Sequence, residues 1–259
     1  MASLAGLKRL MEEGPTIVQR SFPKKELVEL VPESAWGETF HHNDRRYYQT
    51  PGGGIYPSAT TFLGYFSDDK YLIEWRKRVG EAEADRIVER SCKRGEDIHK
   101  ALEHYIEGLP YNAEAEVGEF HFMYEQHRRV LDKDLDSWIA IEHALYSDAL
   151  KVAGRSDLIC YFRGRLSILD YKNKNYVGRT DDMTEYFLQG ALYAIMFEEM
   201  YGVKVEDIVI LAAEDDKKVE KAQVFITKVD KWKDQIYSMN QRFLNENADW
   251  YDIPPLLLL

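Results

Sequence analysis

Residues 154–172 read GRSDLICYFRGRLSILDYK, and the fold that we expect for the chain follows from this segment. Two largely apolar runs flank Arg163-Gly164, which predicts a β-hairpin with a two-residue turn. Across such a turn the numbers of paired residues have a constant sum, so Asp157 lies opposite Asp170. The rest of both hairpin faces is mainly apolar, as expected for a hairpin that is covered on both sides. Lys172 lies two residues beyond Asp170 and therefore returns to the face of the Asp pair.

The opposed aspartates indicate a metal site. Two like charges at facing strand positions destabilise the pairing, and burial adds to the cost unless the carboxylates share a cation or take up a proton. A divalent ion would remove that repulsion. A solvated hairpin end that tolerates both charges remains the alternative. In the same register Arg155 lies opposite Lys172, so either the strands diverge at this point or Arg155 turns toward a phosphate.

The two aspartates form part of a longer pattern. Asp157 is followed, after twelve residues, by Asp170-Tyr171-Lys172. This arrangement resembles the signature of the PD-(D/E)XK nuclease superfamily. Residues 94–103, RGEDIHKALE, resemble the histidine-containing helix motif of the RecB-like exonucleases within that superfamily. Gln189 and Tyr193 resemble the Gln-x-x-x-Tyr motif of the same branch.

The resemblance extends over about residues 54–202. Residues 56–61, YPSATT, and residues 75–80, WRKRVG, resemble segments of the mitochondrial genome maintenance exonuclease and its bacteriophage relatives. Asp-x-Lys alone is a weak signal. The histidine motif, the first Asp, Asp-x-Lys and Gln-x-x-x-Tyr in this order are specific.

The resemblance implies a metal centre and a catalytic lysine. One divalent ion is expected to bind His99, Asp157, Asp170 and the backbone carbonyl of Tyr171. A ligand set rich in oxygen that retains waters favours Mg²⁺ or Mn²⁺. Lys172 is implied to act on the attacking water or on the scissile phosphate.

Four more residues are candidates around this centre. The resemblance assigns Gln189 and Tyr193 to the catalytic group, with Gln189 orienting the lysine or the DNA. Glu142, on the strand before the hairpin, is a candidate for holding a metal-bound water or a second ion, or else is an ordinary charged edge residue. Glu103 is four residues after His99 and shares its helical face, where we expect it to support the site or the fold.

DNA is the partner that the resemblance implies, and its phosphates call for hydroxyl, amide and basic groups. Ser58 or Thr60 would cap a helix whose first amides face a phosphate, although an ordinary N-cap also explains either residue. Arginines before the hairpin would line a basic channel, with solvated helix faces as the alternative. The net charge of −11 limits non-specific binding to duplex DNA, which suits action on ends. The candidate DNA contacts are Ser58, Thr60, Arg76, Arg94, Arg128 and Arg155.

Composition indicates one enzyme-sized domain. A chain of 259 residues with 45% hydrophobic content can bury a full core, and no linker-like segment divides it. We expect a single nuclease domain over residues 1–259, with a helical gateway at about 58–133 and a nuclease core at about 137–246. No apolar run reaches membrane-spanning length, no signal-peptide core is evident, and two cysteines suit a reducing compartment. The expected location is the cytoplasm of a bacterium or of a phage-infected host.

The pattern of apolar residues and turn signals predicts an α/β fold. The predicted strands cover parts of 45–57, then 137–147, 151–162, 165–173, 207–213 and 219–227. The predicted helices start near Ser58 and cover 69–108 with a break at Gly80, 113–133, 183–201 and 229–246. This order matches a restriction-endonuclease-like core, a mixed central β-sheet flanked by helices, with an N-terminal helical insertion. Only the resemblance supplies the strand order.

The sequence therefore predicts a metal-dependent DNA exonuclease. It would hydrolyse phosphodiester bonds from free single-stranded ends in DNA repair, recombination or replication, in a phage or bacterium. One alternative is a double-strand exonuclease or structure-specific endonuclease of the same superfamily. The other is a non-catalytic module that binds DNA or a protein partner. Polarity, product length, the choice between DNA and RNA, the number of ions, the oligomeric state and the protein partners are not predicted.

Overall fold

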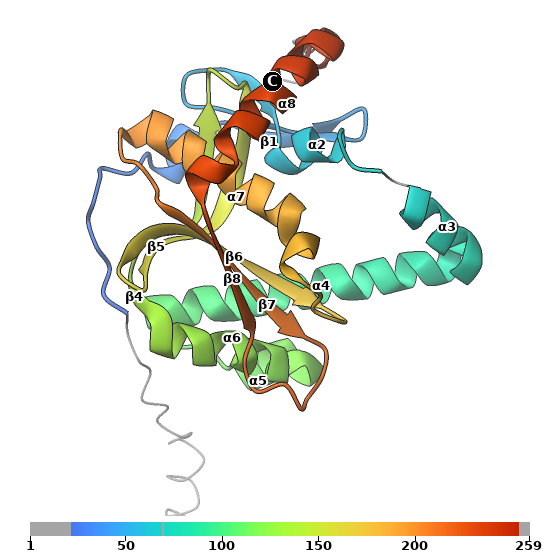
Figure 1. The fold of residues 1–259 in the computed structure, drawn as a ribbon, viewed down its shortest axis with the longest axis vertical. Coiled ribbons are helices and arrows are strands. Elements are labelled where there is room, and N and C mark those ends of the chain that lie inside the picture. Colours follow the sequence, from blue (N-terminus) through green and yellow to red (C-terminus); the bar gives the residue numbers. More distant parts are fainter. Residues whose placement is uncertain (1–21, 69, 254–259) are drawn as a thin grey trace, which may run out of the picture.

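A five-stranded mixed β-sheet forms the centre of the molecule (Figure 1). The structure is a computed structural model, and it describes residues 22–68 and 70–253. The strand order is β4-β5-β6-β7-β8, and every neighbouring pair is antiparallel except β6 and β7. Helix α7 makes the crossover connection that the parallel pair requires. The bounds are β4 (Leu135–Ser147), β5 (Val152–Phe162), β6 (Arg165–Lys174), α7 (Thr184–Tyr201), β7 (Asp207–Glu214) and β8 (Gln223–Lys228).

The hairpin of β5 and β6 has the predicted turn and register. Arg163 (φ 51°) and Gly164 (φ 79°) both adopt the left-handed conformation, as a type I′ turn requires. The strands pair from Phe162–Arg165 to Leu158–Leu169, which confirms the constant sum. The ladder ends there. The predicted divergence at Arg155 is therefore confirmed, and it begins at the level of the two aspartates.

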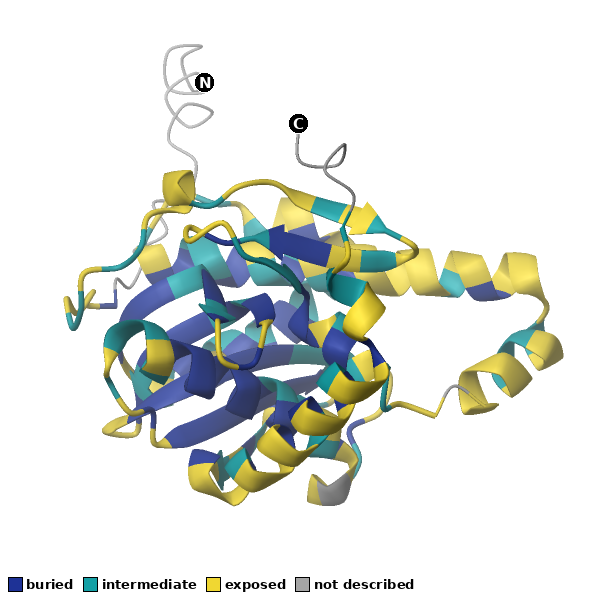
Figure 2. Cartoon of the chain, turned by 90° about the horizontal axis from the view of Figure 1, so that it is seen from above, coloured by how far each residue is buried: buried dark blue, intermediate teal, exposed yellow. Residues whose placement is uncertain are grey.

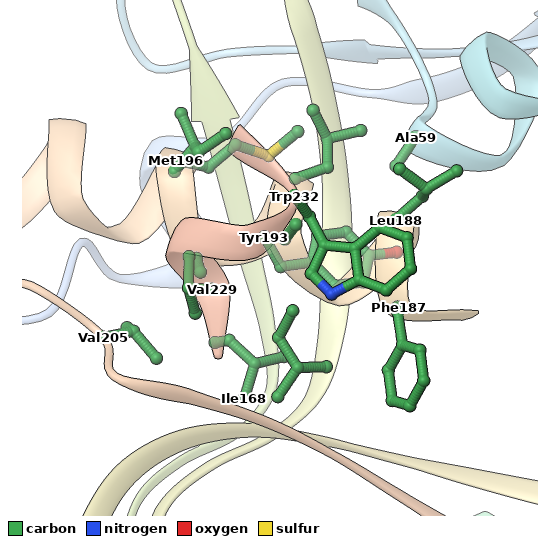
Figure 3. Close-up of a cluster of buried hydrophobic side chains, with 14 of the residues drawn as sticks. Ala59, Ile168, Phe187, Leu188, Tyr193, Met196, Val205, Val229 and Trp232 are labelled. Atoms are coloured by element: carbon green, nitrogen blue, oxygen red, sulfur yellow. The ribbon is translucent and has the colours of Figure 1, made fainter. Parts of the chain in front are cut away.

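Helices cover both faces of the sheet, as the two apolar faces of the hairpin predict (Figure 1). One core lies under α2 (Ala59–Gly64), α7 and α8 (Lys233–Glu246), and Figure 3 shows part of it, with Ile168, Phe187 and Trp232. The other core lies under α4 (Glu81–Glu107) and α6 (His121–Asp134). In β7, Ile208 and Ile210 enter the first core, whereas Val209 and Leu211 enter the second. The sheet is thus the middle of three layers.

The N-terminal part adds a small antiparallel sheet of order β1-β2-β3. Its strands are β1 (Thr39–His42), β2 (Arg45–Gln49) and β3 (Ile55–Pro57). Two more helices are α3 (Lys70–Val79) and α5 (Ala113–Val117). Short 3₁₀ helices are η1 (Glu33–Ala35), η2 (Gly118–Phe120), η3 (Thr180–Met183), η4 (Val229–Lys231) and η5 (Ala248–Tyr251).

One part of the helical region projects away from the sheet. We call residues 70–93, which comprise α3 and the first half of α4, the projecting arm (Figure 1). Within it only Ala84 is buried, and Figure 2 shows its mainly exposed surface. Tyr71, Leu72 and Ile73 are 75%, 47% and 49% exposed. The second half of α4 and α6, in contrast, pack on the sheet.

Most predicted elements are confirmed, and three differ. The helix predicted over 113–133 is divided into α5, η2 and α6, because the φ of 58° at Gly118 lies outside the range of a right-handed α-helix. Strand β8 begins at Gln223 rather than near 219, and β1 was not predicted. The division into a gateway and a core stays a prediction. Over the described residues, no helix has both the length and the hydrophobicity of a membrane span.

Candidate functional site

Three carboxylates lie in a row across β4, β5 and β6. The β4–β5 ladder pairs Ile141 with Leu158 and His143 with Ser156, so Glu142 of β4 faces Asp157 of β5. On the other side of β5, Asp157 faces the position of Asp170 in β6, one step beyond the last ladder pair. The sequence predicted only the second of these pairings. Asp157, on the middle strand, is repelled by a carboxylate on each side, so we expect positive charge nearby.

His99 of α4 supplies one positive charge. Its Nδ1 lies 3.6 Å from Asp157 Oδ2 and 3.9 Å from Glu142 Oε1. Burial, the largest single effect, lowers the pKa of His99, but the carboxylates of Asp157, Glu142 and Asp170 together outweigh it and raise the pKa to about 9. The protonated imidazole therefore compensates the acidic row. The histidine expected at the site lies there.

The geometry of this group suits a divalent ion. His99, Glu142 and Asp157 each offer a ligand atom, and the three atoms lie within 4.8 Å of one another. Around an octahedral ion with bonds of about 2.1 Å, adjacent ligands are ~3 Å apart and opposite ligands ~4.2 Å apart. The separations of 3.6 and 3.9 Å from Nδ1 are wider than the adjacent spacing and narrower than the opposite one, so the three groups enclose a space of about the size of one ion. One imidazole nitrogen and two carboxylates are ligands that Mg²⁺ or Mn²⁺ accepts, so the residues fit.

Tyr171 fixes the orientation of the groups in this cluster. Its backbone nitrogen donates a hydrogen bond to Asp157 Oδ2 at 3.0 Å. Its carbonyl lies 3.2 Å from His99 Nε2 and accepts the Nε2 proton, so Nδ1 is the nitrogen that faces the carboxylates. Nδ1 carries the second proton of the imidazolium in the metal-free protein, and it would bind an ion only after losing that proton. The Tyr171 carbonyl, a predicted metal ligand, thus contacts the ring nitrogen that does not face Asp157 and Glu142.

Asp170 and Lys172 form a second, adjoining group. Asp170 is 3% exposed, and Lys172 Nζ lies 2.8 Å from its Oδ1 and 2.6 Å from its Oδ2. Burial raises the pKa of Asp170, with a smaller contribution from Asp157, although Lys172 opposes both. Burial lowers the pKa of Lys172, but Asp170 and Asp157 outweigh it, so the ammonium stays charged. The same ammonium lies 4.8 Å from the centre of the Tyr186 ring, which favours a cation.

Gln189 and Tyr193 of α7 reach the same place. Gln189 Nε2 donates a hydrogen bond to the Tyr193 hydroxyl at 3.0 Å. A Cβ at Gly154 of β5 would come within 2.7 Å of the Tyr193 ring, so the glycine permits this close approach. Both side chains line a cavity of about 290 Å³ together with His99 and Asp157. Its full lining is Arg46, Tyr48, Ser58, Ala59, Thr60, His99, Glu142, Gly154, Arg155, Asp157, Gln189 and Tyr193.

The predicted DNA contacts divide into two sets. Ser58, Thr60 and Arg155 line the cavity. Ser58 is also the N-cap of α2, and its Oγ accepts a hydrogen bond from the Thr61 amide at 3.0 Å. Ser58 therefore has the ordinary capping role and also lies at the cavity wall.

The other three arginines are paired with protein groups and do not line the cavity. Arg76 binds Glu81 and Asp85. Arg94 is 7% exposed and donates to Asn175 Oδ1, Asp215 Oδ2 and the Asn173 carbonyl at 3.1–3.3 Å, which ties α4 to the sheet. Arg128 binds Glu125 and Asp132 within α6. Glu103 lines a neighbouring cavity of about 510 Å³ with His99 and Glu142, and burial, then Glu142, raise its pKa.

Sequence reasoning did not single out Arg46 or Tyr186. Arg46 is an exposed residue of β2 that lines the same cavity as Asp157. No motif marks Arg46, because the resemblance begins only at about residue 54. Tyr186 lies three residues before Gln189 and shares its helical face, and this spacing is a sequence signal that Tyr186 lies near Lys172.

Comparison with known protein families identifies the superfamily of the chain. The family model of the PD-(D/E)XK nuclease superfamily matches residues 29–253. That range contains every residue of the site described above. No curated protein matches the chain.

Proposed function

The chain belongs to the PD-(D/E)XK nuclease superfamily, which implies metal-dependent cleavage of nucleic acid, and from that premise we propose a DNA exonuclease. It hydrolyses phosphodiester bonds from free single-stranded ends. The observation that carries this proposal is the cluster of His99, Glu142 and Asp157 beside the Asp170–Lys172 pair. The RecB-like branch, a role in DNA repair, recombination or replication, and a bacterial or phage-infected cytoplasm belong to the same proposal.

The acidic cluster would hold the cation. His99 Nδ1, Asp157 and Glu142 face one another, and Asp170 adjoins them from β6. A bound Mg²⁺ or Mn²⁺ would supply positive charge to the phosphate and lower the pKa of a water molecule. Tyr171 orients the cluster, since its amide holds Asp157 and its carbonyl holds the His99 ring.

Lys172 supplies a second, fixed positive charge. Its ammonium is held by Asp170 and by the Tyr186 ring, so it is positioned before substrate binds. Such a charge stabilises the negative charge that develops on the phosphate during attack, and it orients the attacking water. Gln189 and Tyr193 hold each other at the cavity wall and orient the substrate.

Substrate binding is proposed at the same cavity. Arg46, Ser58 and Thr60 bring a guanidinium and two hydroxyls to the wall, which are groups that contact phosphate oxygens. A cavity of about 290 Å³ has room for one splayed nucleotide, which supports the proposal of a single-stranded substrate.

The projecting arm supports action at ends. Its basic residues Lys77 and Arg78 and its aromatic Tyr71 are exposed, and such groups contact the phosphates and unpaired bases of a single strand. We propose that the arm and the body together admit a free end.

The experiment compares linear and circular substrates. The protein is incubated with end-labelled linear single strands, linear duplexes and covalently closed single-stranded circles, with Mg²⁺, Mn²⁺ or excess chelator. The expected result is metal-dependent release of label from linear single strands, with circles intact. Cleavage of circles at a comparable rate would show that the enzyme is an endonuclease. Preference for duplex ends would show that its substrate is double-stranded. No cleavage of any substrate, RNA included, would support the non-catalytic alternative.

A further inference from the structure

Glu142 has an unusual backbone conformation. Its φ is 45°, in the left-handed region that residues with a Cβ rarely adopt, and it lies in the middle of β4. The β4–β5 ladder omits the pair of Glu142 and Asp157 although both neighbouring pairs are present. Local strain of this kind persists only where surrounding groups hold it.

One side chain contacts the backbone of this residue directly. Arg155 Nη1 donates a hydrogen bond to the Glu142 carbonyl at 2.7 Å, from the neighbouring strand β5. Its Nη2 donates to Glu33 Oε1 at 2.5 Å, so one planar guanidinium binds both acceptors. Glu33 belongs to η1 in the N-terminal segment. The two contacts commit the guanidinium to protein groups and not to a phosphate.

The orientation of the Glu142 peptide also sets where its carboxylate points. In an extended strand, successive side chains alternate between the two faces. A left-handed residue interrupts that alternation and changes the direction of its own side chain. In this structure the Glu142 carboxylate lies 3.9 Å from His99 Nδ1 and belongs to the acidic cluster.

We propose that Arg155 is a positioning residue, which holds the left-handed peptide of Glu142 through its carbonyl and thereby places the Glu142 carboxylate in the ion site. Glu33 orients Arg155 from the solvent side. This inference rests on the proposed ion site. It differs from the sequence interpretation of Arg155 as a DNA contact.

The test is a double-mutant cycle on ion affinity without DNA. The dissociation constant of Mn²⁺ is measured from the electron paramagnetic resonance signal of free Mn²⁺, for the parent, Arg155→Gln, Glu142→Gln and the double variant. Arg155→Gln is expected to weaken Mn²⁺ binding by about tenfold or more, the usual scale for losing a group that orients a ligand. Because Arg155 acts through Glu142, the double variant is expected to bind no more weakly than Glu142→Gln alone.

Two further variants separate positioning from a general structural role. Arg155→Lys keeps a cationic donor for the Glu142 carbonyl and is expected to restore part of the affinity. Glu33→Gln, at an exposed pair, is expected to weaken binding by at most about fivefold. Arg165→Gln is the matched control, because Arg165 pairs with Glu206 on the same sheet and should leave Mn²⁺ affinity unchanged. Thermal melts in chelator verify that each variant is folded.

The outcomes are distinct. Unchanged Mn²⁺ affinity in Arg155→Gln, together with weakened affinity in Glu142→Gln, would overturn this inference and leave the ion site intact. Additive effects in the double variant would also overturn it, because Arg155 would then act independently of Glu142. Weaker DNA binding by Arg155→Gln in chelator, with unchanged Mn²⁺ affinity, would show that Arg155 contacts a phosphate instead. Unchanged affinity in Glu142→Gln would overturn both the inference and the proposed cluster.

Discussion

Two buried or half-buried cations balance the acidic row at the level of single residues. His99 lies against Glu142 and Asp157, and Lys172 lies against Asp170. In the metal-free protein these cations relieve part of the repulsion between the carboxylates. The ion competes with the proton of His99 for the same pair of carboxylates.

Lys172 is expected to contribute more to the rate of hydrolysis than to the binding of the ion. Lys172→Met should lower the rate of hydrolysis by about a hundredfold or more, because a preorganised charge is lost, while Mn²⁺ binding persists. The matched control is Lys174→Met, whose ammonium lies 4.7 Å from the same Tyr186 ring. It should stay near the parent rate. Loss of Mn²⁺ binding in Lys172→Met would show that its role is to shape the ion site.

Arg128 is expected to stabilise the fold in a pH-dependent way. Its hydrogen bonds, the largest effect, lower the pKa of Glu125 below 4.5 despite partial burial. A carboxyl whose folded pKa is depressed contributes stability above its unfolded pKa and loses it as the pH falls through the folded pKa. Arg128→Gln should therefore cost about 1 kcal/mol at pH 7, or roughly 2 to 4 °C in Tm, and progressively less below about pH 4.

Thermal melts of parent and variant at pH 7 and pH 3 measure this difference. Arg86→Gln is the matched control, because Arg86 has the same i,i+3 spacing from Glu83 in an exposed pair. It should leave Tm unchanged at both values. An Arg128→Gln variant as stable as the parent at pH 7 would return Arg128 to the set of candidate DNA contacts.

For single helices and strands, the sequence predicts the structure best where the signal comes from neighbouring residues. Arg163-Gly164 determines its own turn, and the turn determines the register of β5 and β6. It was least informative where a partner is distant in the chain. The charge of Arg94 does not reveal that its partner is the carboxylate of Asp215, 121 residues later, and not a phosphate.

Glu142 illustrates a further limit of the sequence. Its left-handed φ depends on Arg155, thirteen residues later, and on the pairing of β4 with β5. Strand propensity predicts an extended residue there. The acidic pair Asp157–Asp170 followed from register alone, whereas the third carboxylate required the neighbouring strand.

Close packing of α7 on β7 gives a prediction for two glycines. A Cβ at Gly190 would lie 2.3 Å from Ile208 Cγ2, in the buried core, whereas a Cβ at Gly95 in α4 would meet nothing within 4 Å. Gly190→Ala should therefore destabilise the protein by about 1 to 2 kcal/mol net, since overpacking exceeds the gain in helix propensity. Gly95→Ala should stabilise it by about 0.5 to 1 kcal/mol. Thermal melts in chelator compare the two, and equal effects would contradict the observed packing.

At the scale of the whole molecule, the layers explain where the site lies. The sheet is covered by α4 and α6 on one face and by α7 on the other (Figure 1). The acidic row forms where β5 and β6 diverge, and both layers contribute to it, His99 from α4 and Gln189 with Tyr193 from α7. A chain with a net charge of −11 thus confines its proposed phosphate contacts to one cavity and the projecting arm.

In the proposed function, this acidic cluster hydrolyses phosphodiester bonds with a divalent cation. The most direct measurement is the release of nucleotides from labelled single-stranded DNA by the parent and by Asp157→Asn, each with Mg²⁺ and with excess chelator. Asp157 is the carboxylate in the middle of the row, so the variant should lose activity while it remains folded in chelator. We predict release by the parent with Mg²⁺ alone and no release in the other three reactions. Release by the parent in excess chelator, or by Asp157→Asn at the parent rate, would show that hydrolysis does not depend on a divalent cation at this cluster.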